Sequence, residues 1–132
     1  MNNLTTVSFE KLQWAFPVAV TLHNLEEAIF IPALWEQRSW HLALSGWEFR
    51  LLGFGFSAVT FLVTYLSVHS GRESAGAYLL AILSGVMFLN ALWHIGATIY
   101  FQSYAPGVVT AVLLVMPVTA CLLYRKIRER YV

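Results

Sequence analysis

The sequence of 132 residues is poor in charged side chains: Asp, Glu, Lys and Arg together make up 11% of it, and aspartate is absent. Hydrophobic residues make up 58%, and the mean hydropathy is +0.64. A soluble domain of this size leaves much of its surface in water and could not bury so much apolar area. The composition therefore excludes an ordinary soluble domain and is typical of an integral membrane protein.

The sequence also has little cysteine and a small net charge. Cys121 is the only cysteine, which excludes a disulfide framework within the chain and a metal site built from cysteines. The formal net charge is only +1, so the sequence does not indicate a nucleic-acid partner. Residues 1–13 lack the positive region and short apolar core of a signal peptide, and we expect the first apolar run to be retained.

Four apolar runs, separated by short polar breaks, organise the chain. They cover residues 14–35, 49–68, 75–101 and 107–124. About 20 apolar residues in a helix are enough to cross the hydrocarbon core of a bilayer. Short breaks favour antiparallel neighbours. The sequence therefore predicts a single all-α domain over residues 1–132, folded as a four-transmembrane-helix up-down bundle.

The basic residues predict how this bundle is oriented. With four spans, one side of the membrane carries six of them: Lys11, Arg72, Arg125, Lys126, Arg128 and Arg130. The other side carries Arg38 and Arg50. Because short cytoplasmic segments are enriched in Lys and Arg, both termini are expected in the cytoplasm of a multi-pass membrane protein.

Three ionisable residues interrupt the first apolar run: His23, Glu26 and Glu27. An acidic side chain near the centre of a membrane helix costs about 2.5 to 3.5 kcal/mol on insertion scales. Ionisable groups at such a depth are therefore candidates for a functional site. His23 and Glu27 are one helical turn apart, a spacing that lets two side chains hold one ion.

The third run contains a matching pair, Asn90 and His94, at the same spacing. Counted from Trp14, Glu27 lies about 20 Å along its helix. Counted from Tyr78, Asn90 and His94 lie about 18 and 24 Å along theirs. Because both spans run outward from the cytoplasm in the predicted topology, the two polar patches are expected to meet at one level of the bilayer.

Charge balance favours a metal site at this level. Two carboxylates and two neutral imidazoles carry a charge of −2, which one divalent cation cancels. We predict that His23, Glu27 and His94 bind the metal. Glu26 is expected to be a general acid or base, or a fourth ligand, and Asn90 to orient a ligand or to donate to a developing oxyanion. Zinc is favoured, the same donors suit iron or manganese, and one position is left open for water.

Simpler structural roles compete with the metal site. Intramembrane His and Glu side chains can hydrogen-bond across helices and hold a bundle together. In the second run, small residues recur on one helical face: Gly53, Ser57, Thr60, Thr64 and Ser67. This face predicts close helix packing, with lining of a cavity as the alternative. His41 and Glu48, in the outer loop, either belong to a solvated loop or complete the site.

Three separated motifs carry a resemblance to a known family: His23-x-x-Glu26-Glu27, Asn90-x-x-x-His94 and Tyr104-x-Pro106-Gly107-x-x-Thr110. Together they make the chain similar to the HXXEE-motif family of small bacterial integral membrane proteins. The resemblance runs from the first span through the fourth. It implies that the His, Glu and Asn residues of the first two motifs are the defining ones, and that the protein lies in the bacterial inner (plasma) membrane. It implies no substrate.

These patterns favour a metal-dependent membrane hydrolase acting on a lipid-like or amphiphilic substrate; with iron, the same ligands would favour an oxidase. One alternative is an electron carrier with a haem held between His23 and His94. Another is a proton-coupled carrier in which Glu26 and Glu27 titrate, or an enzyme using cyclase-type acid chemistry without metal. The expected partners are the bilayer and a hydrophobic or amphiphilic small molecule. The sequence leaves open whether a homodimer completes the site.

Overall fold

The computed structural model describes residues 8–38, 45–71 and 73–128, and all of its regular elements in these ranges are helices. The three long helices are α1 (Phe9–Arg38), α2 (Gly46–Ser70) and α3 (Ala75–Phe101). A fourth helical stretch consists of α4 (Val108–Thr110), the π-helical turn η1 (Ala111–Val115) and α5 (Met116–Arg128). The prediction of an all-α fold is confirmed.

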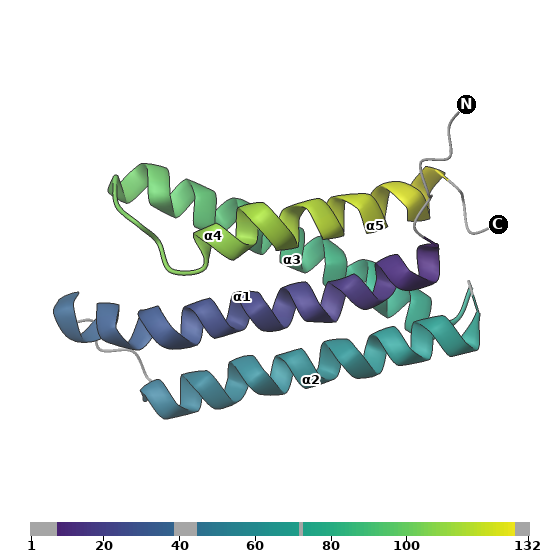
Figure 1. Ribbon diagram of the computed structural model, residues 1–132, viewed down its shortest axis with the longest axis horizontal. Coiled ribbons are helices and arrows are strands. Elements are labelled where there is room, and N and C mark those ends of the chain that lie inside the picture. Colours follow the sequence, from purple (N-terminus) through teal and green to yellow (C-terminus); the bar gives the residue numbers. More distant parts are fainter. Residues whose placement is uncertain (1–7, 39–44, 72, 129–132) are drawn as a thin grey trace.

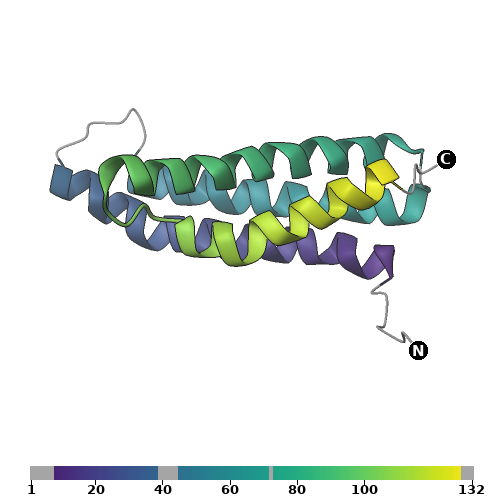
Figure 2. The same ribbon diagram turned by 90° about the horizontal axis from the view of Figure 1, so that it is seen from above.

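The four helical stretches lie side by side with their long axes roughly aligned (Figures 1 and 2). Going around the bundle, α1 packs on α2, α2 on α3, α3 on α5 and α5 on α1. Helices α1 and α3 therefore lie across the bundle from each other. The start of α1 and the end of α5 lie at the same end of the molecule (Figure 2).

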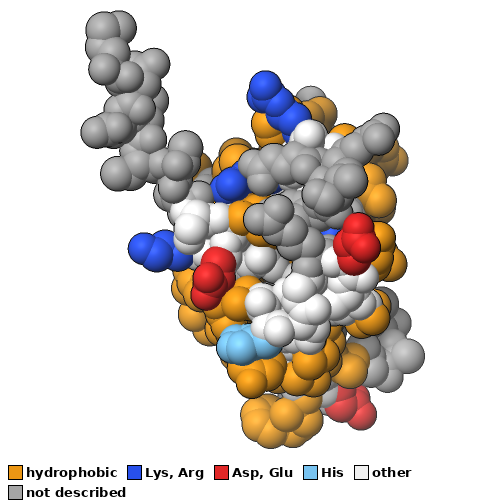
Figure 3. Space-filling view, turned by 90° about the vertical axis from the view of Figure 1, so that its right-hand side faces the viewer, with side chains coloured by type: hydrophobic (Ala, Val, Ile, Leu, Met, Phe, Trp, Pro, Cys, Tyr) orange, Lys and Arg blue, Asp and Glu red, His pale blue; other side chains and the backbone are white. Residues whose placement is uncertain are grey.

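Three of these stretches are long and apolar enough to cross a membrane: α2, α3 and the stretch Val108–Arg128. Helix α1 has 30 residues, about 45 Å of helix, so its length would also suffice. It does not qualify by composition, because His23, Asn24 and the two glutamates that follow lower its hydropathy. Lys, Arg and Glu side chains gather at the end where α1 begins, and hydrophobic side chains flank it (Figure 3).

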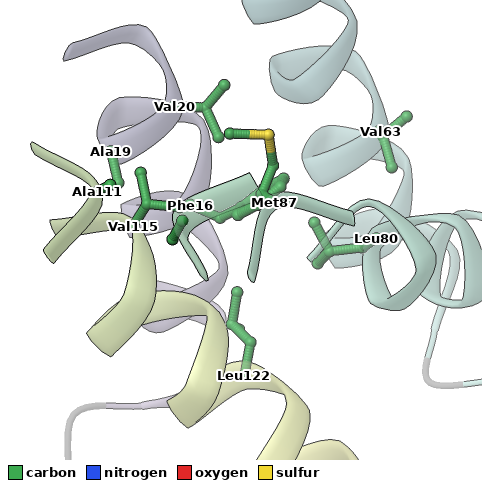
Figure 4. Close-up of a cluster of buried hydrophobic side chains, with 10 residues drawn as sticks. Phe16, Ala19, Val20, Val63, Leu80, Met87, Ala111, Val115 and Leu122 are labelled. Atoms are coloured by element: carbon green, nitrogen blue, oxygen red, sulfur yellow. The ribbon is translucent and has the colours of Figure 1, made fainter. Parts of the chain in front are cut away.

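The core is a cluster of buried apolar side chains from all four helical stretches (Figure 4). Its members are Phe16, Ala19, Val20, Val63, Leu80, Met87, Ala91, Ala111, Val115 and Leu122. The predicted close packing of the small-residue face of α2 is confirmed, since Ser57, Thr60, Thr64 and Ser67 are buried. Asn24 of α1 donates to the Gly53 carbonyl and to the Ser57 hydroxyl, both at 2.8 Å, and thereby ties α1 to this face.

Two prolines alter the helices close to the polar residues. Pro32 has no N–H, so the Ala28 carbonyl one turn earlier loses its helical donor. Nε of Arg50 supplies a replacement hydrogen bond of 3.0 Å to that carbonyl. Pro117 follows the π-helical turn, in which the Met116 N–H reaches back to the Ala111 carbonyl. Such wide turns relieve the missing hydrogen bond of a proline and re-aim the residues before them.

Candidate metal centre

Three side chains that the sequence predicts as metal ligands come together between α1 and α3. We call His23, Glu27 and His94 the His/Glu cluster; one potential ligand atom from each lies within 4.8 Å of the others. Nε2 of His94 lies 3.0 Å from Oε1 of Glu27, and Nε2 of His23 lies 3.7 Å from the same oxygen. The two imidazole rings meet edge to face, with centroids 4.9 Å apart. The cluster thus joins two helices that otherwise lie on opposite sides of the bundle.

The side chains of the His/Glu cluster are largely buried, so their polar atoms need partners within the protein. His23 is 0% exposed and His94 is 6% exposed, whereas the Glu27 side chain keeps 18% of its surface. Within the described ranges, Nε2 of His94 has no hydrogen-bond partner, although Glu27 Oε1 is close, because the contact lacks hydrogen-bond geometry. A buried polar atom without a partner is costly. A divalent cation would satisfy this nitrogen, and the set of two imidazoles and a carboxylate suits zinc, iron or manganese.

Gly107, in the loop between α3 and α4, lies directly against the His/Glu cluster. Its φ of +94° belongs to the left-handed region that favours glycine. A Cβ atom here would lie 2.8 Å from Cε1 of His94 and 2.9 Å from Cε1 of His23. It would also lie 3.1 Å from Cγ of Glu27. The backbone of the loop therefore covers the cluster at a distance that excludes any side chain.

Both ring nitrogens of His23 have partners outside the cluster as well. Nδ1 lies 3.1 Å from the Thr110 hydroxyl, and Nε2 lies 2.9 Å from Nδ2 of Asn90. Asn90 stands one turn before His94 on α3 and contacts the histidine of the other helix. Because Asn90 bonds to the same nitrogen that a metal would need, its role in orienting a ligand stays a prediction.

Glu26 lies outside the His/Glu cluster and faces the loop instead. Its Oε2 accepts hydrogen bonds from the Thr110 N–H at 2.9 Å and from the Thr110 hydroxyl at 2.6 Å. Its Oε1 accepts a hydrogen bond from the Tyr104 phenol. Successive residues on a helix point about 100° apart, so Glu26 and Glu27 serve different neighbours. Glu26 as a general base or fourth ligand stays a prediction, and both of its oxygens are engaged elsewhere.

The phenol of Tyr104 is held in its protonated form. Partial burial and the hydrogen bond to the Glu26 carboxylate raise the pKa of Tyr104 to about 12. A phenol with this pKa remains a donor at neutral pH. Tyr104 also packs edge to face on Phe30, with ring centroids 5.8 Å apart. Through Tyr104 the loop thus contacts α1 at two places, the Phe30 ring and the Glu26 carboxylate.

Sequence reasoning missed the direct contact of Thr110 with His23. In the sequence, Thr110 stands out only as the last residue of the third motif. The spacing of three between Gly107 and Thr110 was the available signal, because it places both at the start of one helical turn. Asn24 was also missed as the residue that fixes α1 on α2.

Of the two outer-loop candidates, Glu48 lies away from the His/Glu cluster. Glu48 forms a capping box with Ser45 at the start of α2, in which its carboxylate accepts the Ser45 N–H at 2.7 Å. The structure therefore gives Glu48 a local role in starting a helix. His41 lies outside the described residues.

Fold and site together define a helical membrane protein with a buried cluster of histidine and glutamate. The chain matches, over residues 14–122, the family described as "Protein of unknown function with HXXEE motif", and it belongs to that family. It is similar to the "Uncharacterized protein YrkK" of Bacillus subtilis (strain 168), with 30% identity over 113 residues. That match covers 83% of this chain and 71% of the relative. No solved structure matches the chain. The predicted family is confirmed.

Proposed function

We propose that the chain is a metal-dependent integral membrane enzyme that hydrolyses an ester or amide bond in a lipid-like or amphiphilic substrate. The observation that carries this proposal is the buried His/Glu cluster, in which Nε2 of His94 lies beside the Glu27 carboxylate without forming a hydrogen bond. Catalytic zinc sites use three protein ligands of this kind and keep one position open. The family description names a motif and no reaction, so the proposed chemistry rests on the donor set alone.

We further propose that α1 is a fourth span, with both chain ends in the cytoplasm of a bacterial cell. Its polar residues His23 and Asn24 are buried in the bundle, whereas Leu22, Leu25 and Ile29 on its other face are exposed. A helix with this arrangement offers lipid an apolar surface although its mean hydropathy is low. The six basic residues near the two ends and the second loop support this orientation.

In the proposed site, Glu27 and the Nε2 atoms of His23 and His94 would hold the metal. Zinc is favoured, with iron or manganese as alternatives that the same donors suit. When bound, a divalent ion supplies Lewis-acid activation at neutral pH, which removes the need for a strong base. Asn90 donates to Nε2 of His23, and a metal bound at that nitrogen would free the Asn90 amide to donate to a negative charge developing beside the ring.

The substrate class follows from where the cluster lies. The two helices that carry it expose apolar residues to the surroundings, among them Ile29 on α1 and Leu89 on α3. A water-soluble substrate would have to cross this apolar layer, whereas an amphiphile already resides in it. Phe30 and Tyr104, both half exposed, form an aromatic wall beside the loop that covers the cluster. Such a wall suits the boundary between an acyl chain and a polar head group.

The geometry argues against a haem between the two histidines. Oε1 of Glu27 lies 3.0 and 3.7 Å from their Nε2 atoms, where the iron and its porphyrin would need room. A carrier that uses the glutamates for proton coupling would produce flux in liposomes that depends on a pH gradient. The hydrolase predicts no such flux.

Elemental analysis of the purified, detergent-solubilised protein tests the proposal. We expect about one zinc, iron or manganese ion per chain, as in mononuclear catalytic sites. Glu27→Gln should lose the ion, whereas Glu10→Gln, an exposed glutamate of the same helix, should keep it. Hydrolysis of a fatty-acid ester in mixed micelles should then stop on chelation and return with added metal. A wild-type protein that hydrolyses the ester equally well without metal would overturn the proposal.

A further inference from the structure

The two adjacent glutamates of the motif contact different parts of the molecule, and this division points to a specific task for the first. We infer that Glu26 is a positioning residue that acts through Thr110 to fix the tautomer of His23, so that the Nε2 lone pair of that ring faces the His/Glu cluster. The inference rests on the metal site proposed above, and it assigns to Glu26 neither metal binding nor proton transfer.

Thr110 has a single hydroxyl proton to donate. Its Oγ1 lies 2.6 Å from a Glu26 carboxylate oxygen and 3.3 Å from the Gly107 carbonyl oxygen, and both of these can only accept. The Glu26 carboxylate is the nearest of the possible acceptors and the strongest, because it is charged, so it takes the hydroxyl proton. Toward Nδ1 of His23, at 3.1 Å, the hydroxyl can only accept. Nδ1 must then carry the ring proton.

The contact on the other side of the His23 ring specifies the same tautomer. Nδ2 of Asn90 lies 2.9 Å from Nε2 of His23, and an amide nitrogen only donates. Nε2 must therefore offer a lone pair. Contacts from α3 and from α4, which are independent of each other, specify one protonation pattern. The Nε2 lone pair, on the nitrogen that faces Glu27, accepts from Asn90, and a metal bound at Nε2 would replace this hydrogen bond.

Glu26 acts on the loop before the fourth helical stretch as a charged acceptor. It accepts three hydrogen bonds from the segment that carries Gly107: one from the Tyr104 phenol and two from Thr110. A charged acceptor strengthens each of them. Metal-binding histidines commonly donate their second N–H to a carboxylate. Here the Thr110 hydroxyl stands between the imidazole and the carboxylate and passes on the same orienting effect.

Histidine ring NMR on ¹⁵N-labelled protein measures the tautomer directly, because a protonated and an unprotonated ring nitrogen differ in shift. The sequence has four histidines, and the signals of His23 are those missing from His23→Gln. Wild-type protein should carry the His23 proton on Nδ1. Thr110→Val should move it to Nε2 or produce a mixture, and Thr110→Ser should restore the wild-type pattern. Thr119→Val, which removes a buried hydroxyl bonded only within its own helical stretch, should change nothing.

Zinc affinity supplies the second readout. Thr110→Val should bind Zn²⁺ about 10- to 100-fold more weakly, the usual effect of losing a partner behind a metal-bound histidine. Thr110→Ser and Thr119→Val should bind like wild type. A wild-type His23 with its proton on Nε2 overturns the inference even if Thr110→Val does not fold. Unchanged tautomer and affinity in Thr110→Val overturn it as well. Wild-type protein that binds no Zn²⁺ overturns the proposed function instead, and the His23 tautomer still decides the inference.

Discussion

Nε2 of His94 lies 3.0 Å from Oε1 of Glu27 and so connects α3 to α1 across the bundle. The two helices otherwise pack on α2 and α5 rather than on each other. A cation held at this point would therefore join opposite sides of the molecule. Metal binding should be visible as stability of the whole bundle as well as in chemistry.

Zinc should stabilise the wild-type protein against unfolding and fail to stabilise His94→Gln. A ligand present at 100 times its dissociation constant adds about 2.7 kcal/mol to the free energy of unfolding. Thermal unfolding in detergent, with and without Zn²⁺, measures the difference. His69→Gln is the matched control, because His69 is exposed and bonds to a carbonyl of its own helix. Equal stabilisation of His94→Gln by zinc would contradict the assigned ligand set.

Gly107→Ala should abolish metal binding. The substitution adds a Cβ within 2.9 Å of both imidazole rings of the His/Glu cluster. Gly71→Ala is the control: its φ of +89° is also in the left-handed region, but nothing lies within 4 Å of the added atom. Each variant should lose about 1 to 3 kcal/mol of stability from backbone strain. Only Gly107→Ala should lose zinc as measured by elemental analysis, and retention of the metal would show that the loop does not cover the site.

Alkaline pH should loosen the loop at Tyr104. The folded protein raises the pKa of this phenol from 10 to about 12, so folding favours the protonated form. The resulting stability is fully present below pH 10 and is lost as the pH rises toward 12. Phenolate absorbance, taken as wild type minus Tyr104→Phe, should show one tyrosine ionising near pH 12. An ionisation completed below pH 10 would contradict the hydrogen bond to Glu26.

Arg50→Met should destabilise the protein because it leaves the Ala28 carbonyl without the donor that replaces the missing N–H of Pro32. Loss of a partner from a buried acceptor costs about 1 to 3 kcal/mol. In a Pro32→Ala background the helix supplies its own N–H, so the same Arg50→Met change should cost less. A double-mutant cycle by thermal unfolding measures this coupling. Additive effects would mean that Arg50 acts elsewhere.

Much of the helical framework was predictable, because long apolar runs leave few other structures. The residues at which the helices begin were less predictable. Helix α2 begins at Gly46 rather than at 49, since the Ser45 capping box adds a turn that hydropathy does not register. Helix α1 begins at Phe9, before the apolar run starts at Trp14. Hydropathy follows contact with lipid, whereas helices end where backbone donors and acceptors find other partners.

The meeting of the two helices at His23, Glu27 and His94 was predictable from spacing and depth. It was not predictable that Glu26 would contact the loop while Glu27 contacts the two histidines. The helix period separates their directions, but the neighbour that each meets depends on how the loop after α3 folds back. Thr110 reaches His23 only through that fold, and no periodic pattern in the sequence encodes it.

The π-helical turn Ala111–Val115 sets the direction in which Thr110 points. It holds one residue more per hydrogen-bonded ring than an ordinary α-helical turn. Removing one residue between 111 and 115 would tighten the turn and swing Thr110 by about 100° around the helix axis, away from His23. The additional residue in this turn therefore sets the rotation of Thr110 about the helix axis. Deleting it would break the contact between Thr110 and His23 without changing the identity of any motif residue.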